Sequence, residues 1–417
     1  MAIETANREE FYREARNDLP GPLAGVRVIE VTTTWAGPRC GGILADYGAD
    51  VVRVEWPATP DICHLLPPML PGSEPPDGYL SQSANKNKRS IALNVRTEQG
   101  RAAFMRMLPL FDIVLENFKK GTMAAWGCGY QECRKVKPDI IYISITGFGQ
   151  FGPYSERPGY DPAAQAYSGF MWMNAEYEED HPLRAPIFVA DELAGLHAAL
   201  GAVAALRHRD QTGEGQHVDV SLLDAMMDSC TGLQVLAAAG LPTPRIGNPM
   251  PFAAPTGVFK CKDGYVYAGV LLDTHWKIMA KMIGRPELAD DPRYANFSDR
   301  VVRRQEVDEI LEAWCRERTR EEVVKACRDA QIAVAPVYTP QEAVNDAHII
   351  AREMLQPLTN QAGNTVRLNN TAAKFSRTPA RNRSCAPRLG EHTEEVLRES
   401  GMNEDEIAAL HKAGVIV

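Results

Sequence analysis

Short apolar runs alternate with helical patterns through the first half of the chain. The runs are rich in Val and Ile, which favour strands, and the segments between them have the spacing of amphipathic helices. Strands are predicted over residues 26–31, 49–55, 90–95, 112–116, 139–144 and 217–221, and helices over residues 39–47 and 98–108. This alternation predicts an α/β fold with a Rossmann-like sheet, which we expect to be mixed, with both parallel and antiparallel strand pairs.

The pattern changes after residues 240–255, a stretch rich in Pro and Gly that we interpret as a linker. Two β runs then flank Lys262-Asp263-Gly264, which is a hairpin signal. Helices are predicted over residues 274–284, 302–317, 320–330, 392–400 and 403–413, with further strands after residue 336. Because 417 residues exceed one ordinary core, we predict segments at 1–225 (large α/β domain), 226–335 (linker and smaller α+β domain) and 336–417.

The longest helical pattern begins at an acidic residue. An apolar stretch over residues 185–190 leads to Asp191, and residues 193–206 continue as an Ala- and Leu-rich run, so Asp191 is predicted to be the first helical residue. An aspartate at a helix start commonly accepts orphan backbone N–H groups, and this capping interpretation stays open. The helix is too apolar for the surface, so we also expect Asp191 to open into an interior cleft. There a carboxylate can attack an activated acyl group.

Composition narrows the class of protein. A formal net charge of −9 argues against nucleic acid as a partner, because phosphate binding needs a basic face. The nine cysteines are scattered, and Cys128 and Cys133 form the only close pair, so we expect free thiols in a reducing cytoplasm and no metal site. Residues 1–21 are charged throughout, unlike a secretory signal, and no stretch is expected to span a bilayer. These observations predict a cytoplasmic protein with no membrane partner.

A dinucleotide site is the first chemical hypothesis for the N-terminal unit. A strand, a turn, a helix and a second strand ending in Glu55 have the outline of a nicotinamide site. That site needs glycines which let the backbone approach the pyrophosphate, whereas Trp35-Ala36-Gly37-Pro38 fills the turn here. We therefore expect no NAD.

Motifs along most of the chain resemble those of the class III CoA-transferases, the family of formyl-CoA, carnitine-CoA and bile-acid-CoA transferases. The matching segments include PLAGVRVIEVTTTWAGPRCGGILADYGADVVRVE, IVLENFKKGTM, ISITGFGQFGPY, GYDPAAQAYSGFM, VADELAGLHAALGAVAAL and TGEGQHVDVSLLDAMM, in that order. The resemblance implies two open α/β domains, with residues 336–417 returning to the large CoA-binding domain. It also implies that two chains thread through each other as an interlocked dimer.

The resemblance implies an activity as well: CoA moves from an acyl-CoA donor to a carboxylic acid, with no metal or redox cofactor. Asp191 matches the family nucleophile, which forms an acyl-aspartyl anhydride and then an aspartyl-CoA thioester. Backbone N–H groups at the start of the Asp191 helix and in Gly147-Phe148-Gly149 are candidates to stabilise oxyanions. The glycine turn equally fits an ordinary loop.

CoA contacts are carried over by matching positions. The matching residues are Thr34, Trp35, Ala36, Leu93, Arg96, Asn117 and Phe118. Lys88 and Arg89, just upstream of Leu93, are candidates to lie near the phosphates, and the alternative for them is a solvated charged surface. Trp56 and Trp126 stand where formyl-CoA transferases carry arginines, which makes Lys119 and Lys120 further candidates for the phosphates.

Two alternative functions remain open from the sequence. The related α-methylacyl-CoA racemases add a His as second acid/base, and Tyr160 occupies that position here, although a phenol with an ordinary pKa is a poor base. A non-catalytic subunit of a hetero-oligomer is the other alternative. The aromatic residues Trp35, Trp126 and Trp172 favour a bulky apolar acceptor or a substituted dicarboxylate if they line the pocket, or core packing if they do not. Succinyl-CoA is the donor hypothesis.

Overall fold

The computed structural model describes residues 7–59, 61–71, 77–174, 181–230, 232–243, 245 and 247–417. Residues 1–6 of the predicted charged N-terminus, and Pro244 and Ile246 of the predicted linker, lie outside this set. The chain forms two compact units, one of residues 1–170, 185–235 and 348–417, the other of residues 171–184 and 236–347. The boundaries expected after residues 225 and 335 fall shortly before the unit boundaries at 235/236 and 347/348.

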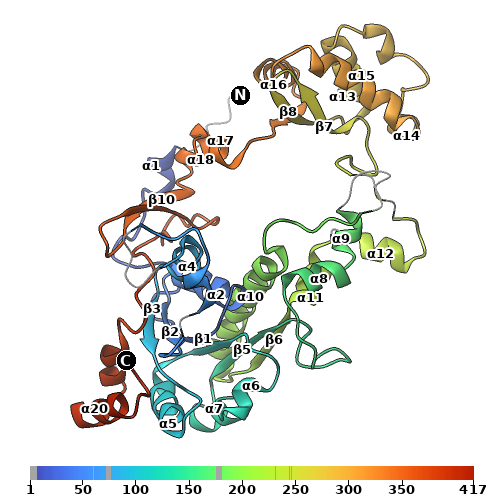
Figure 1. The fold of residues 1–417 in the computed structure, drawn as a ribbon. Helices are drawn as coiled ribbons and strands as arrows, with labels where there is room; N and C mark the ends of the chain where they lie inside the picture. Colours follow the sequence, from blue (N-terminus) through green and yellow to red (C-terminus); the bar gives the residue numbers. More distant parts are fainter. Residues whose placement is uncertain are drawn as a thin grey trace. The chain divides into compact units, whose positions relative to one another are not determined.

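The first unit is built on a six-stranded sheet with the order β3-β2-β1-β4-β5-β6 (Figure 1). Its strands are β1 (Arg27–Val31), β2 (Asp50–Glu55), β3 (Arg89–Ala92), β4 (Ile113–Glu116), β5 (Ile141–Thr146) and β6 (His217–Ser221). Every pairing within this sheet is parallel, which corrects the expectation of a mixed sheet. Parallel sheets are covered on both faces, and this explains why the strands appear as continuous Val- and Ile-rich runs.

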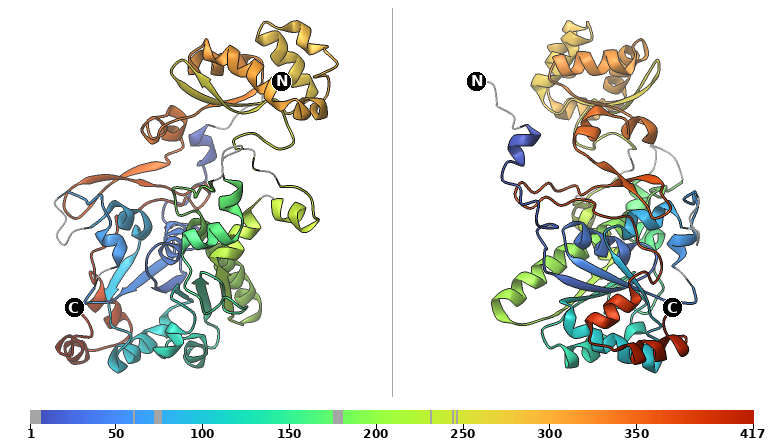
Figure 2. Two further views of the ribbon diagram at one scale, coloured as in Figure 1. Left: turned by 45° about the vertical axis from the view of Figure 1, so that its right-hand side comes forward. Right: turned by 90° about the vertical axis from the view of Figure 1, so that its left-hand side faces the viewer.

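Helices cover both faces of the sheet. One face packs against α2 (Ala36–Asp46), α10 (Val189–Thr212) and α11 (Leu222–Ser229), and the other against α5 (Glu98–Met107), α7 (Tyr130–Val136), α19 (Thr393–Glu399) and α20 (Glu404–Lys412). Successive strand residues alternate between the two cores, as Val28 and Ile29 do. The two C-terminal helices, predicted from the sequence, lie beside α5 in every view (Figures 1 and 2). An isolated bridge from Leu93 to Ile416 ties the chain end to the end of β3.

Shorter elements complete the first unit. They are α1 (Arg8–Phe11), α3 (Ile62–Leu65), α4 (Tyr79–Asn85), η1 (Leu108–Leu110), α6 (Thr122–Ala125), α8 (Asp161–Tyr167) and the antiparallel pair β10 (Leu355–Thr359) and β11 (Thr365–Asn369). Three helices lie where the chain passes between the units: α9 (Phe170–Met173), α12 (Leu233–Ala238) and α18 (Ala347–Ala351).

Helix α10 packs closely on α2 through its small residues. A Cβ at Gly195 would lie 3.0 Å from the Ala36 carbonyl oxygen and 2.9 Å from the Arg39 side chain, so a glycine is needed for this approach. With 24 residues, α10 meets the length and composition of a membrane span, which corrects the sequence expectation that no stretch does. Its buried alanines, including Ala194 and Ala198, belong to the core, and a core helix can have the same composition.

The second unit is a small α+β structure. Its antiparallel sheet has the order β7-β8-β9, from β7 (Thr256–Cys261), β8 (Gly264–Gly269) and β9 (Ala333–Pro336). The hairpin predicted at Lys262-Asp263-Gly264 is confirmed, because Cys261 pairs with Gly264 across it. The helices are α13 (Asp273–Met282), η2 (Pro286–Ala289), α14 (Phe297–Val302), α15 (Arg304–Arg316), α16 (Arg320–Asp329) and α17 (Pro340–Ala343). The predicted helices 274–284, 302–317 and 320–330 correspond to α13, α15 and α16.

Candidate active site

Two turns that follow neighbouring strands meet near the centre of the parallel sheet. The strand order reverses between β1 and β4, and at such a switch point the carboxyl ends of the strands open a crevice for ligands. Residues 32–36 follow β1 and residues 117–120 follow β4. Both stretches line two adjoining cavities of the first unit.

Side chains hold the turn after β1 in an unusual conformation. Thr34 has a φ of 64°, in the left-handed region that β-branched residues rarely adopt. The Asn117 amide exchanges two hydrogen bonds of 2.8 Å with the backbone of Thr33, and Asp61 accepts the Thr34 N–H at 2.8 Å. Cys63 donates its thiol to the Thr34 carbonyl at 2.9 Å. The strained turn is therefore built into the fold, as is common at functional sites.

Asp191 lies in the first turn of α10 but does not cap it. The helix begins two residues earlier, at Val189, which corrects the prediction that Asp191 is the first helical residue. Asp161 of α8 accepts the Ala190 N–H at 2.7 Å, so the capping interpretation of Asp191 is also corrected. Gln165 donates to the other carboxylate oxygen of Asp161 at 2.6 Å. With the capping role taken by Asp161, the Asp191 side chain lines a cavity, as the sequence predicted.

The environment of Asp191 changes its acidity. Burial, followed by the charges of Asp161 and Glu192, raises the pKa of the Asp191 carboxyl to about 7. A carboxylate with a raised pKa is a stronger base and nucleophile, and such shifts are common at active sites. The Glu192 carboxylate accepts hydrogen bonds from two donors, the Trp35 indole N–H at 2.8 Å and the Arg39 guanidinium at 2.7 Å.

The cavity that contains Asp191 has a volume of about 310 Å³. Among the described residues of its lining, Asp191 is the one carboxylate. Three cations, Lys119, Lys120 and Arg157, line the same cavity. The other lining residues include the turn after β1, Gly147, Phe148, Tyr160 and Leu222. A cavity lined by three cations and one carboxylate suits a substrate that carries negative charge.

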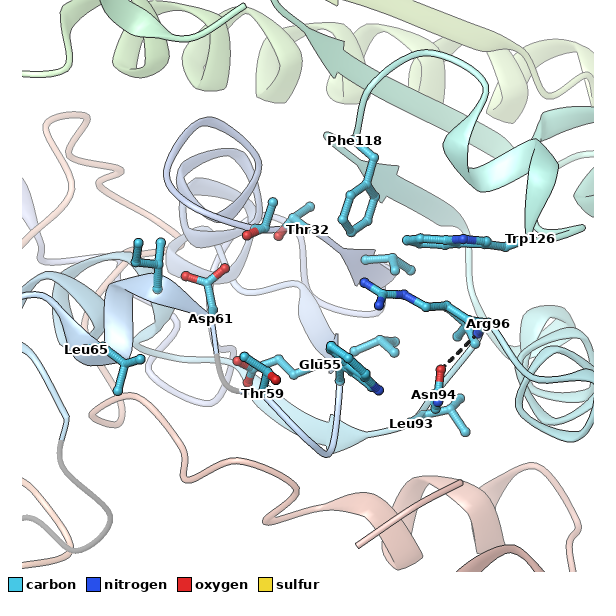
Figure 3. Close-up of a pocket in the computed structure, with 16 residues that line it drawn as sticks. Thr32, Glu55, Thr59, Asp61, Leu65, Leu93, Asn94, Arg96, Phe118 and Trp126 are labelled. Atoms are coloured by element: carbon cyan, nitrogen blue, oxygen red, sulfur yellow. Dashed lines mark hydrogen bonds between the residues drawn. The ribbon is translucent and has the colours of Figure 1, made fainter. Parts of the chain in front are cut away.

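A second cavity, of about 390 Å³, lies over the ends of β2 and β3 (Figure 3). Arg96 lies there between two indoles, with its guanidinium carbon 4.3 Å from the Trp56 ring centre and 5.0 Å from that of Trp126. The Trp126 ring also meets Phe118 edge-on, at 5.0 Å between centroids. The two tryptophans that replace the expected arginines thus hold one arginine in a stacked position.

The two cavities adjoin, because Thr33 and Phe118 line both of them. Of the predicted CoA contacts, Thr34, Trp35, Ala36 and Asn117 line the Asp191 cavity, and Leu93 and Arg96 line the second. The structure therefore brings these separate sequence segments together around one extended space, which could accommodate an elongated ligand whose reactive end reaches Asp191.

Lys88 and Arg89 line neither cavity. The Lys88 ammonium is fully buried and pairs with Glu30 at 2.8 Å. Arg89 pairs with Asp50 at 2.6 Å and with Glu399 at 2.7 Å. The structure therefore gives no support to the expectation that this pair lies near the phosphates, because protein carboxylates already bind both cations. Lys88 is buried, whereas Arg89 lies in a partly exposed network of ion pairs, closer to the alternative of a charged surface.

Two of the predicted oxyanion donors have protein acceptors. Asp161 accepts the Ala190 N–H, and the Thr146 hydroxyl accepts the Gly149 N–H at 2.8 Å. Gly147 and Phe148 do line the Asp191 cavity. The first turn of α2 lines it too, and the N-cap of α2 makes no side-chain hydrogen bond, so its N–H groups are a further source of donors.

Three residues of the site were missed by sequence reasoning. Asp61 lies in a Pro-rich loop whose pattern gave no sign of its contact with Thr34. Asp161 could have been found, because an aspartate directly before a proline at a helix start is an N-terminal signal. Arg157 carried no signal in the sequence, since an isolated arginine is usually solvated.

Comparisons with known proteins agree with this site. The sequence profile described as CoA-transferase family III matches residues 23–393. The chain is 35% identical to the "Succinyl-CoA--L-malate CoA-transferase beta subunit" of Chloroflexus aurantiacus, over 95% of this chain and 98% of that protein. It is 35% identical to the "Succinate--glutarate CoA-transferase" of Agrobacterium fabrum, over 92% and 97%. A crystal structure of a CAIB/BAIF family protein from Brucella suis superposes with a TM-score of 0.82 at 32% identity, covering 91% of this chain and all of that one.

Proposed function

Because the chain belongs to CoA-transferase family III and is therefore an acyl-CoA:carboxylate CoA-transferase, we propose that its donor is succinyl-CoA and its acceptor a small dicarboxylic acid. Two relatives have names that pair a four-carbon acyl donor or product with the dicarboxylates malate and glutarate. The three cations around Asp191 support a substrate with a second negative charge better than a bulky apolar acid. The racemase alternative has no support among these transferase relatives.

One observation carries the proposal. Asp191, with its raised pKa, lines the same cavity as the strained turn after β1 and the residues that follow β4. A carboxylate of raised pKa in this position supports Asp191 as the nucleophile.

In the first half-reaction, the Asp191 carboxylate attacks the thioester carbonyl of the donor. The C–S bond breaks, the CoA thiolate leaves, and Asp191 carries a mixed anhydride. The thiolate then attacks the Asp191 carbonyl of that anhydride, which releases the donor acid as its carboxylate and leaves an aspartyl-CoA thioester. Each attack creates an oxyanion, and the N–H groups at the start of α2, which lines the cavity through Ala36, are candidates to stabilise it.

In the second half-reaction, the acceptor carboxylate attacks the aspartyl-CoA thioester and again expels the thiolate. The thiolate attacks the acceptor carbonyl of the new anhydride, so the product acyl-CoA forms and the Asp191 carboxylate is regenerated. Holding both partners in one cavity makes each attack effectively intramolecular.

We place the nucleotide end of CoA in the second cavity and its thiol end beside Asp191. Arg96 is stacked between Trp56 and Trp126, which cover both faces of its planar guanidinium. It would therefore meet a phosphate with its N–H edge. Phe118 and Thr33 would flank the pantetheine where the two cavities adjoin. Lys119 and Lys120 remain candidates for the diphosphate.

The assembly and location are also part of the proposal. Helix α10 exposes Leu196, Leu200 and Val203 at helical spacing, with 52%, 65% and 38% of each residue accessible. An apolar stripe on a helix whose other side is core fits a surface covered by another chain, and we propose an interlocked homodimer. The β-subunit relative also allows a hetero-oligomer. We assign the larger unit as the CoA-binding domain, the smaller as the second domain, and the cytoplasm as the location.

A chromatographic assay tests the function. The purified chain is incubated with succinyl-CoA and, separately, with malate, glutarate, other short dicarboxylates, and monocarboxylates as acceptors. We expect the CoA thioester of at least one dicarboxylate to form with equimolar succinate, and Asp191→Asn to form none. Hydrolysis of succinyl-CoA without any acceptor thioester, or equal product with Asp191→Asn, would contradict the proposal.

A further inference from the structure

Arg157 is a cation in the lining of the Asp191 cavity that forms no ion pair with a described residue of the chain. The other two cations, Lys119 and Lys120, share Glu156, at 4.0 and 3.1 Å. Within the part of the chain that the structure describes, no carboxylate lies within ion-pair distance of Arg157. Arg157 is also solvent-exposed, so a ligand in the cavity can reach its guanidinium without displacing a protein carboxylate.

Aromatic side chains fix the position of Arg157 without cancelling its charge. Its guanidinium carbon lies 3.8 Å from the centre of the Tyr154 ring, and Nη1 donates to the Tyr167 hydroxyl at 3.2 Å. The centroids of the two tyrosine rings lie 5.5 Å apart, with the rings tilted relative to each other. Both rings also meet Phe148 edge-on, Tyr154 at 5.9 Å and Tyr167 at 5.5 Å. A guanidinium has five N–H donors, so most remain available for an anion.

The same packing fixes Arg157 relative to Asp191. Helix α8 carries Tyr167 near its end and Asp161 at its start, and Asp161 caps the helix of Asp191. The loop between Gly147 and Gly159 also folds tightly on itself: a Cβ on Gly159 would lie 2.8 Å from the Gly147 Cα. Contacts with α8 therefore hold both Arg157, through Tyr167, and the start of the Asp191 helix, through Asp161.

We propose that Arg157 binds the remote carboxylate of the dicarboxylate substrates and so selects diacids over monoacids. The inference rests on the proposed function. The free carboxylate of succinyl-CoA enters the cavity while Asp191 is ionised, and it would be repelled by the Asp191 charge unless a cation met it. The remote carboxylate of the acceptor enters the same cavity when Asp191 is a neutral thioester, and the same cation would fix its position. The planar fork of the guanidinium matches a carboxylate with two parallel hydrogen bonds. Arg157 makes and breaks no covalent bond; it is a specificity residue.

The test compares Arg157→Gln and Arg157→Lys with the unmodified enzyme. Each is assayed with glutarate and with pentanoate, a monoacid of equal chain length, and with succinyl-CoA and butyryl-CoA as matched donors. Arg134→Gln, on an exposed position of α7, is the matched arginine control. If pentanoate turns over too slowly to give a kcat/KM, glutarate and pentanoate are compared as inhibitors instead. Their inhibition constants are measured against the cleavage of succinyl-CoA by the enzyme in the presence of hydroxylamine. Thermal unfolding is recorded for every variant.

We expect Arg157→Gln to lower kcat/KM for glutarate and for succinyl-CoA by about 10- to 100-fold, the range for a lost charged hydrogen bond. Pentanoate and butyryl-CoA should change less than about threefold, Arg157→Lys should be intermediate, and the unfolding temperature should not move. An equal loss for diacids and monoacids would overturn the inference, because Arg157 would then serve CoA or the fold. No loss at all would also overturn it. An unmodified enzyme that transfers CoA to no acid would instead refute the proposed function.

Discussion

Asp161 accepts the backbone N–H of Ala190 at 2.7 Å, one residue before Asp191, the proposed nucleophile. The hydrogen bond caps helix α10, while the negative charge of Asp161 raises the pKa of Asp191. One carboxylate therefore orients the nucleophile and tunes its basicity. Because burial is the largest cause of the raised pKa and Asp161 the second, the two effects can be separated by substitution.

The pH dependence of the reaction follows from this pair. Only ionised Asp191 attacks a thioester, so kcat/KM for succinyl-CoA should rise with pH through about 7. Asp161→Asn keeps an oxygen for Ala190 and removes the charge, which lowers the pKa of Asp191 and moves the rise to lower pH. Glu192→Gln removes the smaller of the two charge effects and should shift the profile less. An unchanged midpoint in Asp161→Asn, measured from initial rates across pH, would contradict the assignment of Asp191.

The raised pKa also predicts a cost in stability. The unfolded pKa of an aspartate is about 3.9, and the folded value for Asp191 is about 7. The folded state then holds the proton more tightly, so it loses stability as pH rises between these two values. Asp191→Asn has no such loss. The unfolding free energy of Asp191→Asn should exceed that of the unmodified chain by only a little at about pH 4. The difference should grow as the pH rises to the folded pKa of about 7 and stay constant above it. Urea unfolding at several pH values measures this difference, and one that does not grow with pH would count against the burial of the charge.

The stacked arginine of the second cavity gives a prediction for CoA binding. Arg96→Ala should raise KM for succinyl-CoA by about tenfold or more, because a charged hydrogen bond to phosphate is lost. Trp126→Ala removes one stacking face, at 5.0 Å from the guanidinium, and should raise KM by a few-fold. In the double variant the two losses should be less than additive. Strictly additive effects in this cycle would show that Trp126 does not act through Arg96.

The buried Lys88–Glu30 pair is predicted to serve the fold. Lys88→Met leaves the Glu30 carboxylate without its ammonium at 2.8 Å and should cost about 3–5 kcal/mol of unfolding free energy. Adding Glu30→Gln should restore part of that loss, since the uncompensated charge is then removed. Denaturant unfolding of the three variants checks this. If Lys88→Met kept full stability but lost affinity for CoA, Lys88 would belong to the CoA site after all.

The positions of strands and helices could be predicted from the sequence better than the contacts that these elements make with one another. Runs such as residues 26–31 and 112–116 are short and rich in Val and Ile, and the structure confirms them as β1 and β4, strands that are covered on both faces. Pairing direction is a long-range property, so the wholly parallel sheet was not foreseen. The start of α10 was misjudged because the capping residue, Asp161, lies 29 positions before Ala190 in the chain and is brought there by tertiary packing.

The same distinction holds for the site. Asp191, Arg96 and Phe118 could be picked out by matching motifs, and the structure places all three in the two cavities. Lys88 could not be separated from a phosphate ligand, because its sequence context does not reveal that Glu30 lies within 2.8 Å. Arg157 could not be found for the converse reason: its place in the cavity lining, and its contacts with Tyr154 and Tyr167 rather than with a described carboxylate, become visible only in the structure.

The central claim is that Asp191 becomes covalently acylated, and trapping it is the most direct test. The enzyme is incubated with succinyl-CoA in the presence of hydroxylamine, digested, and analysed by mass spectrometry of the peptide that contains residue 191. We predict a hydroxamate on the Asp191 carboxyl that requires the donor and is missing from Asp191→Asn. An unmodified Asp191 in an enzyme that still releases CoA from succinyl-CoA, or a hydroxamate on another carboxylate, would contradict the account.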